Sequence, residues 1–192
     1  MALAITSAPT NELLSVEEAK RHLRLLSSDL DDEVSSLIRA ARDYCERWTQ
    51  RTLRTSTTRT LTLAQWWGDC TTDAIKLPWP PLLTVSGITY YDTDNASQTL
   101  GTSNYSVETS TDGGGRVIWT STATIPALYT REDAVTITFT TGYADADAVP
   151  PVALQAMKLA ISYLWPGREG ERDSNEKAIR TLLAGVDWTG YA

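Results

Sequence analysis

Few residues of this 192-residue chain have the types and spacing that catalysis or metal binding requires. His22 is the single histidine, which excludes an HExxH zinc motif and any pair of histidine ligands. The sequence also lacks a GxSxG motif that would present the nucleophile of a serine triad. We therefore predict that the chain is not an enzyme, that it binds no cofactor or metal, and that His22 lies at the surface.

Three further motifs resemble known sites, but each has a simpler structural explanation. The "TDGGGRV" segment lacks the Lys and Ser/Thr pair of a phosphate-binding loop, which leaves a flexible turn. The "DTDNAS" segment has Ser97 where a calcium loop needs glycine, and a hairpin turn explains it. Asp145 and Asp147 could pair as carboxylates, but capping of the next helix accounts for them as well.

The two cysteines, Cys45 and Cys70, form no CxxC motif. Cys45 falls on the apolar face of a predicted helix, which favours a small core residue over half of a disulfide or a nucleophile. The chain therefore has no predicted nucleophile for covalent chemistry.

Composition narrows the classes of partner. The chain has 17 Lys and Arg against 24 Asp and Glu, a net charge of −7, which opposes tight binding to phosphates. The apolar fraction of 42% is that of a globular protein, and no apolar run approaches the length of a membrane span. The start "MALAITSAPTNELLS" lacks the basic residues of a signal peptide, so we expect a soluble, cytoplasmic chain.

Tryptophans are the residues that most suggest binding, since seven are present. Aromatic side chains at strand ends and in loops anchor protein partners and also stack on sugars. Two interpretations follow: contact with a protein partner, or a carbohydrate-binding β module with helical flanks. Those outside the predicted helices are Trp66, Trp67, Trp79, Trp119 and Trp188, whereas Trp48 and Trp165 are predicted to lie in the core.

Two helices open the chain. Ser15 and Glu18 form a capping-box pattern, which predicts a short helix to about Leu25. The second, longer helix covers "DDEVSSLIRAARDYCERWTQR", where one apolar stripe recurs at helical spacing. Its members are Val34, Leu37, Ile38, Ala41, Cys45 and Trp48.

The remaining face of the second helix is polar, with Arg39, Arg42, Asp43, Glu46 and Gln50. It is either a solvated face or a subunit interface in which arginines act as anchors. On the second interpretation we predict that Arg39, Arg42 and Arg47 pair with acidic residues of a neighbouring copy.

From Arg54 the pattern changes to short segments rich in Thr, Val, Ile and Tyr, separated by turn residues. In "AVTITFTTGY", Val135, Ile137 and Phe139 alternate with threonines, so one face of that strand is predicted to be buried. Residues 55–143 are therefore predicted to be an antiparallel β unit, a sandwich or an open barrel.

Helix returns after "DADAVPP", where Pro150 and Pro151 suit a helix start. The segment "VALQAMKLAISYLW" is apolar almost all round, which predicts a central helix or one sandwiched between subunits. We predict an α+β fold in which residues 1–54 and 144–192 form one helical domain. Its short N-terminal, long second and long C-terminal helices make the core into which the β unit of residues 55–143 is inserted.

The order of these pieces resembles the head-tail connector, or adaptor, family of tailed bacteriophages and gene transfer agents. The motifs are the capped first helix, the "DDEV" helix, "LPWPPLLTVSGITYYD", "VTITFTTGY" and "VPPVALQAMKLAISYLW". They extend from about Leu14 to Leu183. Within this resemblance, Pro78 to Pro81 are expected to lead the chain into the β unit as an extended edge segment.

The resemblance implies a structural adaptor that acts by binding. Copies would form a ring under the capsid portal, expected to be dodecameric there, although the free protein can be a monomer. The ring would extend the DNA channel, pass DNA without sequence-specific binding and dock the stopper or tail. This implies a location at the head-tail interface of a virion assembled in the host cytoplasm, with no membrane partner.

The C-terminal segment is expected to reach the portal. Residues 176–192 are predicted to be loosely packed in the free subunit and to become ordered on the portal, with Trp188 as an anchor. The alternative is that the segment packs permanently on the subunit's own helices. The predicted portal-binding residues are Ile179, Leu182, Leu183, Trp188 and Tyr191.

Overall fold

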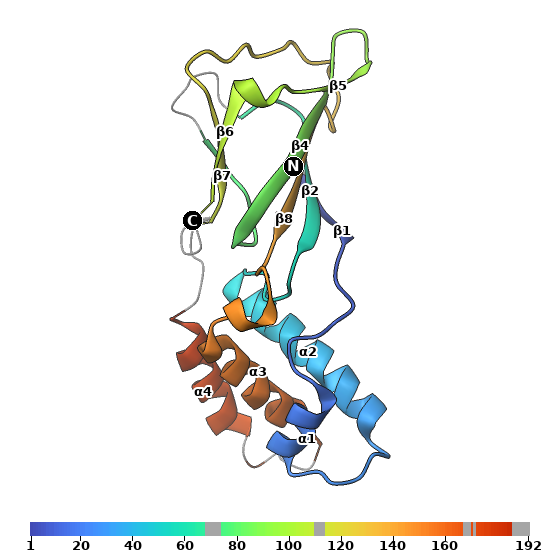
Figure 1. Cartoon of the computed structure of the whole chain (residues 1–192), viewed down its shortest axis with the longest axis vertical. Coiled ribbons are helices and arrows are strands. Elements are labelled where there is room, and N and C mark those ends of the chain that lie inside the picture. The colour runs from blue at the N-terminus through green and yellow to red at the C-terminus, as the bar shows by residue number, and fades with distance from the viewer. Residues whose placement is uncertain (68–73, 110–113, 167–169, 171, 186–192) are drawn as a thin grey trace. The chain divides into compact units, whose positions relative to one another are not determined.

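The computed structural model describes residues 1–67, 74–109, 114–166, 170 and 172–185. The chain forms two compact units (Figure 1). The β unit comprises residues 1–8 and 56–142, and the helical unit comprises residues 9–55 and 143–192. The protein is α+β, and its strands pair in antiparallel sheets.

The β unit holds two antiparallel sheets (Figure 1). In spatial order, the five-stranded sheet consists of β1 (Ala2–Ser7), β2 (Thr57–Leu63), β8 (Val135–Thr141), β4 (Leu82–Tyr91) and β5 (Ser97–Thr99). The three-stranded sheet consists of β3 (Ala74–Lys76), β7 (Arg116–Trp119) and β6 (Tyr105–Glu108). A short 3₁₀ helix, Thr102–Asn104, precedes β6.

Strand β8 is the centre of the larger sheet and carries the core of the unit. Val135, Ile137 and Phe139 are fully buried, whereas the threonines between them are half-buried, which confirms the predicted alternation. Both sheets contribute to one apolar cluster, which includes Leu61, Ile88, Val117, Trp119 and Phe139. Burial of this shared cluster holds the two sheets together.

Strand β1 corrects the expectation that residues 1–54 are helical. Residues 2–7 pair with β2, about sixty positions further along the chain, and thus belong to the β unit. Five of the six residues of β1 are exposed, so the strand has no pattern of buried positions that the sequence could reveal. Strand β5 was also not predicted, and its three residues are exposed.

The proline segment does not lead into the β unit as expected. Strands β2 and β3 precede it, and Pro78 to Pro81 connect β3 of the smaller sheet to β4 of the larger one. Strand β4 lies between β8 and β5, and β5 pairs with its last three residues, 89–91. The Arg59 guanidinium lies 4.7 Å from the centre of the Trp79 ring, a cation–π contact within the β unit.

The helical unit consists of α1 (Val16–Leu23), α2 (Asp31–Thr49), α3 (Pro151–Leu164) and α4 (Arg172–Leu183). A 3₁₀ turn, Ala146–Ala148, precedes α3, and the Asp145 side chain caps it by accepting from the Ala148 amide. Helix α3 packs against the three other helices, which explains why its sequence is apolar almost all round.

Local sequence signals set the ends of the first helix. The Ser15 hydroxyl accepts from the Glu18 amide, and the Glu18 carboxylate accepts from the Ser15 amide, which confirms the capping box. The helix stops at Arg24, whose φ of 61° is left-handed.

Helix α2 buries most of its predicted stripe. Val34, Ile38, Ala41 and Cys45 are buried, and burial raises the pKa of the Cys45 thiol to about 12, as expected for a core residue. Trp48 was predicted to lie in the core, but 39% of it is exposed and the Arg180 guanidinium lies over its ring at 4.9 Å. The stripe thus turns away from the core at the last turn of α2.

Gly115 provides a test of the packing between the two sheets. A methyl group at Gly115 would overlap the Leu82 side chain, so Gly115→Ala is expected to lower the free energy of unfolding of the β unit by about 1–3 kcal/mol. Gly87→Ala is the matched control, because no atom lies within 4 Å of its added methyl group. Denaturant unfolding followed by tryptophan fluorescence measures both variants. Equal stability of the two would contradict the packing.

Candidate interaction surfaces

A buried ionic cluster centres on Arg42 in α2. Arg42 Nε donates to Glu12 at 2.8 Å, and its Nη1 donates to Glu46 at 2.9 Å. Arg54 Nη2 also reaches Glu12, at 3.3 Å. Only 7% of Arg42 is exposed, so these charges neutralise one another away from water.

The same cluster satisfies backbone groups that would otherwise lack partners. The second carboxylate oxygen of Glu46 accepts from the amides of Leu53 and Arg54, at 2.8 and 3.2 Å. Arg54 Nη1 donates to the carbonyl of Pro9 at 3.4 Å. The cluster therefore ties the N-terminal segment and the segment after α2 to the same helix.

The three arginines predicted to contact a neighbouring subunit have different surroundings. Arg42 does not lie on a solvated face, because two carboxylates of its own chain bind it. Arg39 is exposed and donates to Ser36, and Arg47 is exposed and pairs with Asp43 one turn away. Contact with a neighbouring subunit stays a prediction for all three residues.

Removal of the Arg42 charge tests the cluster. Arg42→Met is expected to lower the free energy of unfolding by about 3 kcal/mol, because Glu12 and Glu46 lose the charge that neutralises them in a buried site. Arg39→Met is the control on the same helix, and its exposed side chain predicts a change of about 0.5 kcal/mol or less. Thermal and denaturant unfolding measure the difference. A smaller loss for Arg42→Met than for Arg39→Met would contradict the role of the cluster.

Three tryptophans of the β unit, Trp66, Trp67 and Trp119, pack on one another. The Trp67 and Trp119 rings stack at 4.8 Å, and Trp66 meets both edge-on. Trp119 is 2% exposed and its indole nitrogen donates to the Trp67 carbonyl. Trp66 is half-buried and donates to the Pro126 carbonyl, so it fastens the long segment between β7 and β8.

This packing removes the observation that favoured a carbohydrate-binding module. Sugars stack on an open aromatic face, whereas Trp67 and Trp119 cover each other's faces. Trp79 is half-buried beside Arg59. Partner contact through Trp66 or Trp79 stays a prediction.

Helix α4 corrects the expectation that residues 176–192 are loosely packed. Ile179 and Leu183 are fully buried in the core of the helical unit, and Leu182 packs against the same core. This was the alternative interpretation of the segment, and it holds as far as the end of α4. Trp188 and Tyr191 lie outside the described residues.

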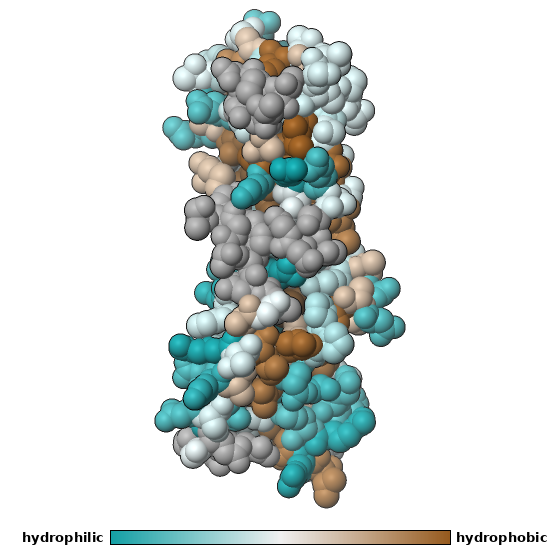
Figure 2. All heavy atoms as spheres, turned by 90° about the vertical axis from the view of Figure 1, so that its left-hand side faces the viewer, coloured by the Kyte–Doolittle hydropathy of each residue, from teal (hydrophilic) through white to brown (hydrophobic). Residues whose placement is uncertain are grey.

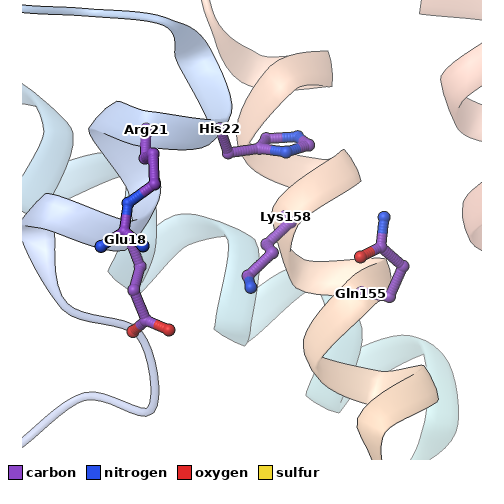
Figure 3. Close-up of a pocket in the computed structure, with 5 residues that line it drawn as sticks. All are labelled: Glu18, Arg21, His22, Gln155 and Lys158. Carbon is purple, nitrogen blue, oxygen red and sulfur yellow. The ribbon is translucent and has the colours of Figure 1, made fainter.

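A shallow hollow of about 320 Å³ lies between α1 and α3 (Figure 3). Glu18, Arg21 and His22 of α1 line one side, and Gln155 and Lys158 of α3 line the other. His22 is half-buried, and its Nε2 lies 3.0 Å from the Ser162 hydroxyl of α3, so it joins the two helices. The pKa of Glu18 is lowered by the Ser15 amide and, more weakly, by Lys158 and Arg21.

The described part of the chain contains no group of three or more His, Cys, Asp and Glu side chains arranged to hold a metal ion. No helix within that part is long and apolar enough to cross a membrane. On the face that Figure 2 shows, apolar atoms of the helical unit lie among hydrophilic side chains.

Comparison with solved structures finds the same fold in particle necks. The matches include a chain in the neck of an empty gene transfer agent particle with C6 symmetry, 24% identical. A chain in the native virion is 25% identical, and one in the native neck with C12 symmetry is 24% identical. Each match covers 98% of this chain and 96% of the other, with a TM-score of 0.76.

No family model and no curated protein sequence matches the chain. The structural matches agree with the predicted resemblance to head-tail connector proteins, because the shared fold extends over nearly the whole chain. They point to a structural protein of a virion neck and not to an enzyme.

Proposed function

We propose that this chain is a head-tail adaptor, which forms a ring under the capsid portal and provides the surface on which a stopper or tail docks. The observation that carries the proposal is the fold match over 98% of the chain to proteins of a gene transfer agent neck. The helical unit is the core of the adaptor, and the β unit consists of an N-terminal strand and the residues between α2 and α3.

Charge supports a passive role toward DNA. A ring around a DNA channel benefits from walls that do not hold phosphates, and the chain carries a net charge of −7. The ring extends the channel without reading sequence. Its copies assemble on the portal, expected as a dodecamer, at the head-tail interface of the virion.

Deletion of the gene for this chain, in the strain that produces the particles, tests the adaptor function. We expect filled heads without tails, because the docking surface is missing, and recovery of tailed particles when the chain is supplied from a plasmid. Electron microscopy of purified particles counts both classes. Normal numbers of tailed particles without the chain would overturn the proposed function.

The portal contact is assigned to the C-terminal end of the chain, beyond α4. Ile179 and Leu183 belong to the core and are therefore not proposed as portal contacts. We propose that Trp188 and Tyr191 make most of the portal contact and that half-buried Leu182 makes a smaller one. A tryptophan that becomes buried in an interface is among the side chains that contribute most to binding.

Truncation separates portal binding from stability. Deletion of residues 186–192 is expected to leave the melting temperature unchanged, since the core of α4 is complete at Leu183, but to abolish binding to heads that lack the chain. Leu183→Ala is the control, because it opens a cavity in the core and lowers the melting temperature. A truncated chain that melts early and still binds heads would show that the tail is structural.

A further inference from the structure

The cationic side chains that make no ion pair, hydrogen bond or ring contact are concentrated in one part of the helical unit. Most described Lys and Arg side chains make an ion pair, a hydrogen bond or a ring contact. Among the described residues, those without any of these contacts are Arg21, Arg24, Lys158 and Lys177. Arg21 lies on α1, Arg24 directly follows α1, Lys158 lies on α3, and Lys177 lies on α4.

Two hollows meet at Arg21. The first is the hollow of Figure 3, into which Lys158 extends from α3 toward α1. The second, of about 550 Å³, is lined by residues of α1 and of the turn after it, including Arg21, Arg24, Leu25 and Leu26. Leu26 is 100% exposed. We call Arg21, Arg24, Lys158 and Leu26 the cationic face.

We propose that the cationic face binds the acidic surface of a second copy of this chain and forms one half of the contact that closes the ring. The proposal rests on the proposed function. A ring needs two different, complementary patches on each subunit, because its contacts run head to tail. Copies that each carry −7 repel one another, so their contacts must bring opposite charges together.

The same face fits other partners less well. Glu17 and Glu18 lie among its cations and interrupt the row of positive charge that a DNA duplex would follow. A membrane would gain only one fully exposed leucine, which is too little apolar area for stable anchoring. Carboxylates of a neighbouring subunit can meet separate cations, and a single apolar contact can cover Leu26.

Charge reversal tests the proposal on heads purified from the deletion strain. The double variant Arg21→Glu, Lys158→Glu is expected to stay folded with a somewhat lower melting temperature, because neither side chain makes an ion pair within the described chain but both attract the Glu18 carboxylate. It is expected to join heads at least about tenfold less than wild type. Lys177→Glu is the control for charge reversal, since Lys177 is an exposed cation of α4 that lies outside the cationic face, and it should join heads normally.

Crosslinking identifies the partner of the face. Wild-type protein, half of it labelled with ¹⁵N, is assembled on these heads and treated with a zero-length carbodiimide, which joins amines to carboxylates. We expect peptides that link Lys158 of one isotope to an Asp or Glu of this chain in the other isotope. Vesicles of anionic lipid and a DNA duplex serve as probes for the other partners.

The outcomes separate the two proposals. Normal incorporation of the double variant, or Lys158 crosslinked only to a different neck protein, would overturn the ring contact and leave the adaptor function standing. Loss of vesicle or duplex binding in the double variant, with incorporation unchanged, would also overturn it. Failure of wild-type protein to join heads would overturn the adaptor function and this inference with it.

Discussion

The ion cluster around Arg42 is the interaction on which the arrangement of the helical unit depends. The chain passes between the two units three times, near residues 8, 55 and 142. Beside each passage lies a residue that belongs to the cluster or is hydrogen-bonded to its member Arg54. Arg54 donates to Pro9 and Glu12, and its carbonyl accepts from the amide of Tyr143. The Arg54 side chain thus joins the N-terminal segment to the segment after α2, and a backbone hydrogen bond of the same residue adds Tyr143.

Each unit has a core of its own, and the two cores are built differently. The helical unit surrounds α3 with three amphipathic helices, whereas the β unit closes two sheets over a cluster rich in β-branched and aromatic side chains. Tryptophans take part in the second core because the smaller sheet has few residues and needs large side chains to fill the space. Packing therefore explains the cluster of Trp66, Trp67 and Trp119.

A protein of this kind acts through the surfaces that its cores hold in place. The described surface has shallow hollows, paired surface charges and a few exposed apolar side chains, all of which suit contacts between proteins. Solved structures with the same fold come from the neck and the virion of gene transfer agent particles. The net negative charge of the chain makes the location of each unpaired cation informative.

Much of the fold could be predicted from the sequence because its signals are local. The capping box of Ser15 and Glu18, the stripe from Val34 to Cys45 and the alternation in β8 each depend on residues within a turn or two of one another. The sequence alone also shows that it lacks the catalytic motifs considered above, and the order of its predicted elements indicates the family resemblance. For the candidate surfaces, the sequence indicated which residue types could contact a partner, but not which of those residues would be buried.

The tertiary structure decided everything that depends on distant partners. Strand β1 exists only because β2 pairs with it, and Arg42 is buried only because Glu12, thirty positions earlier, reaches the same side of α2. Trp119 became a core residue through Trp67, whereas Trp48 lies on the exposed side of the last turn of α2, where the Arg180 guanidinium lies over its ring. A sequence specifies which side chains suit water or an apolar core. Their actual burial follows from which other parts of the chain the fold brings against them.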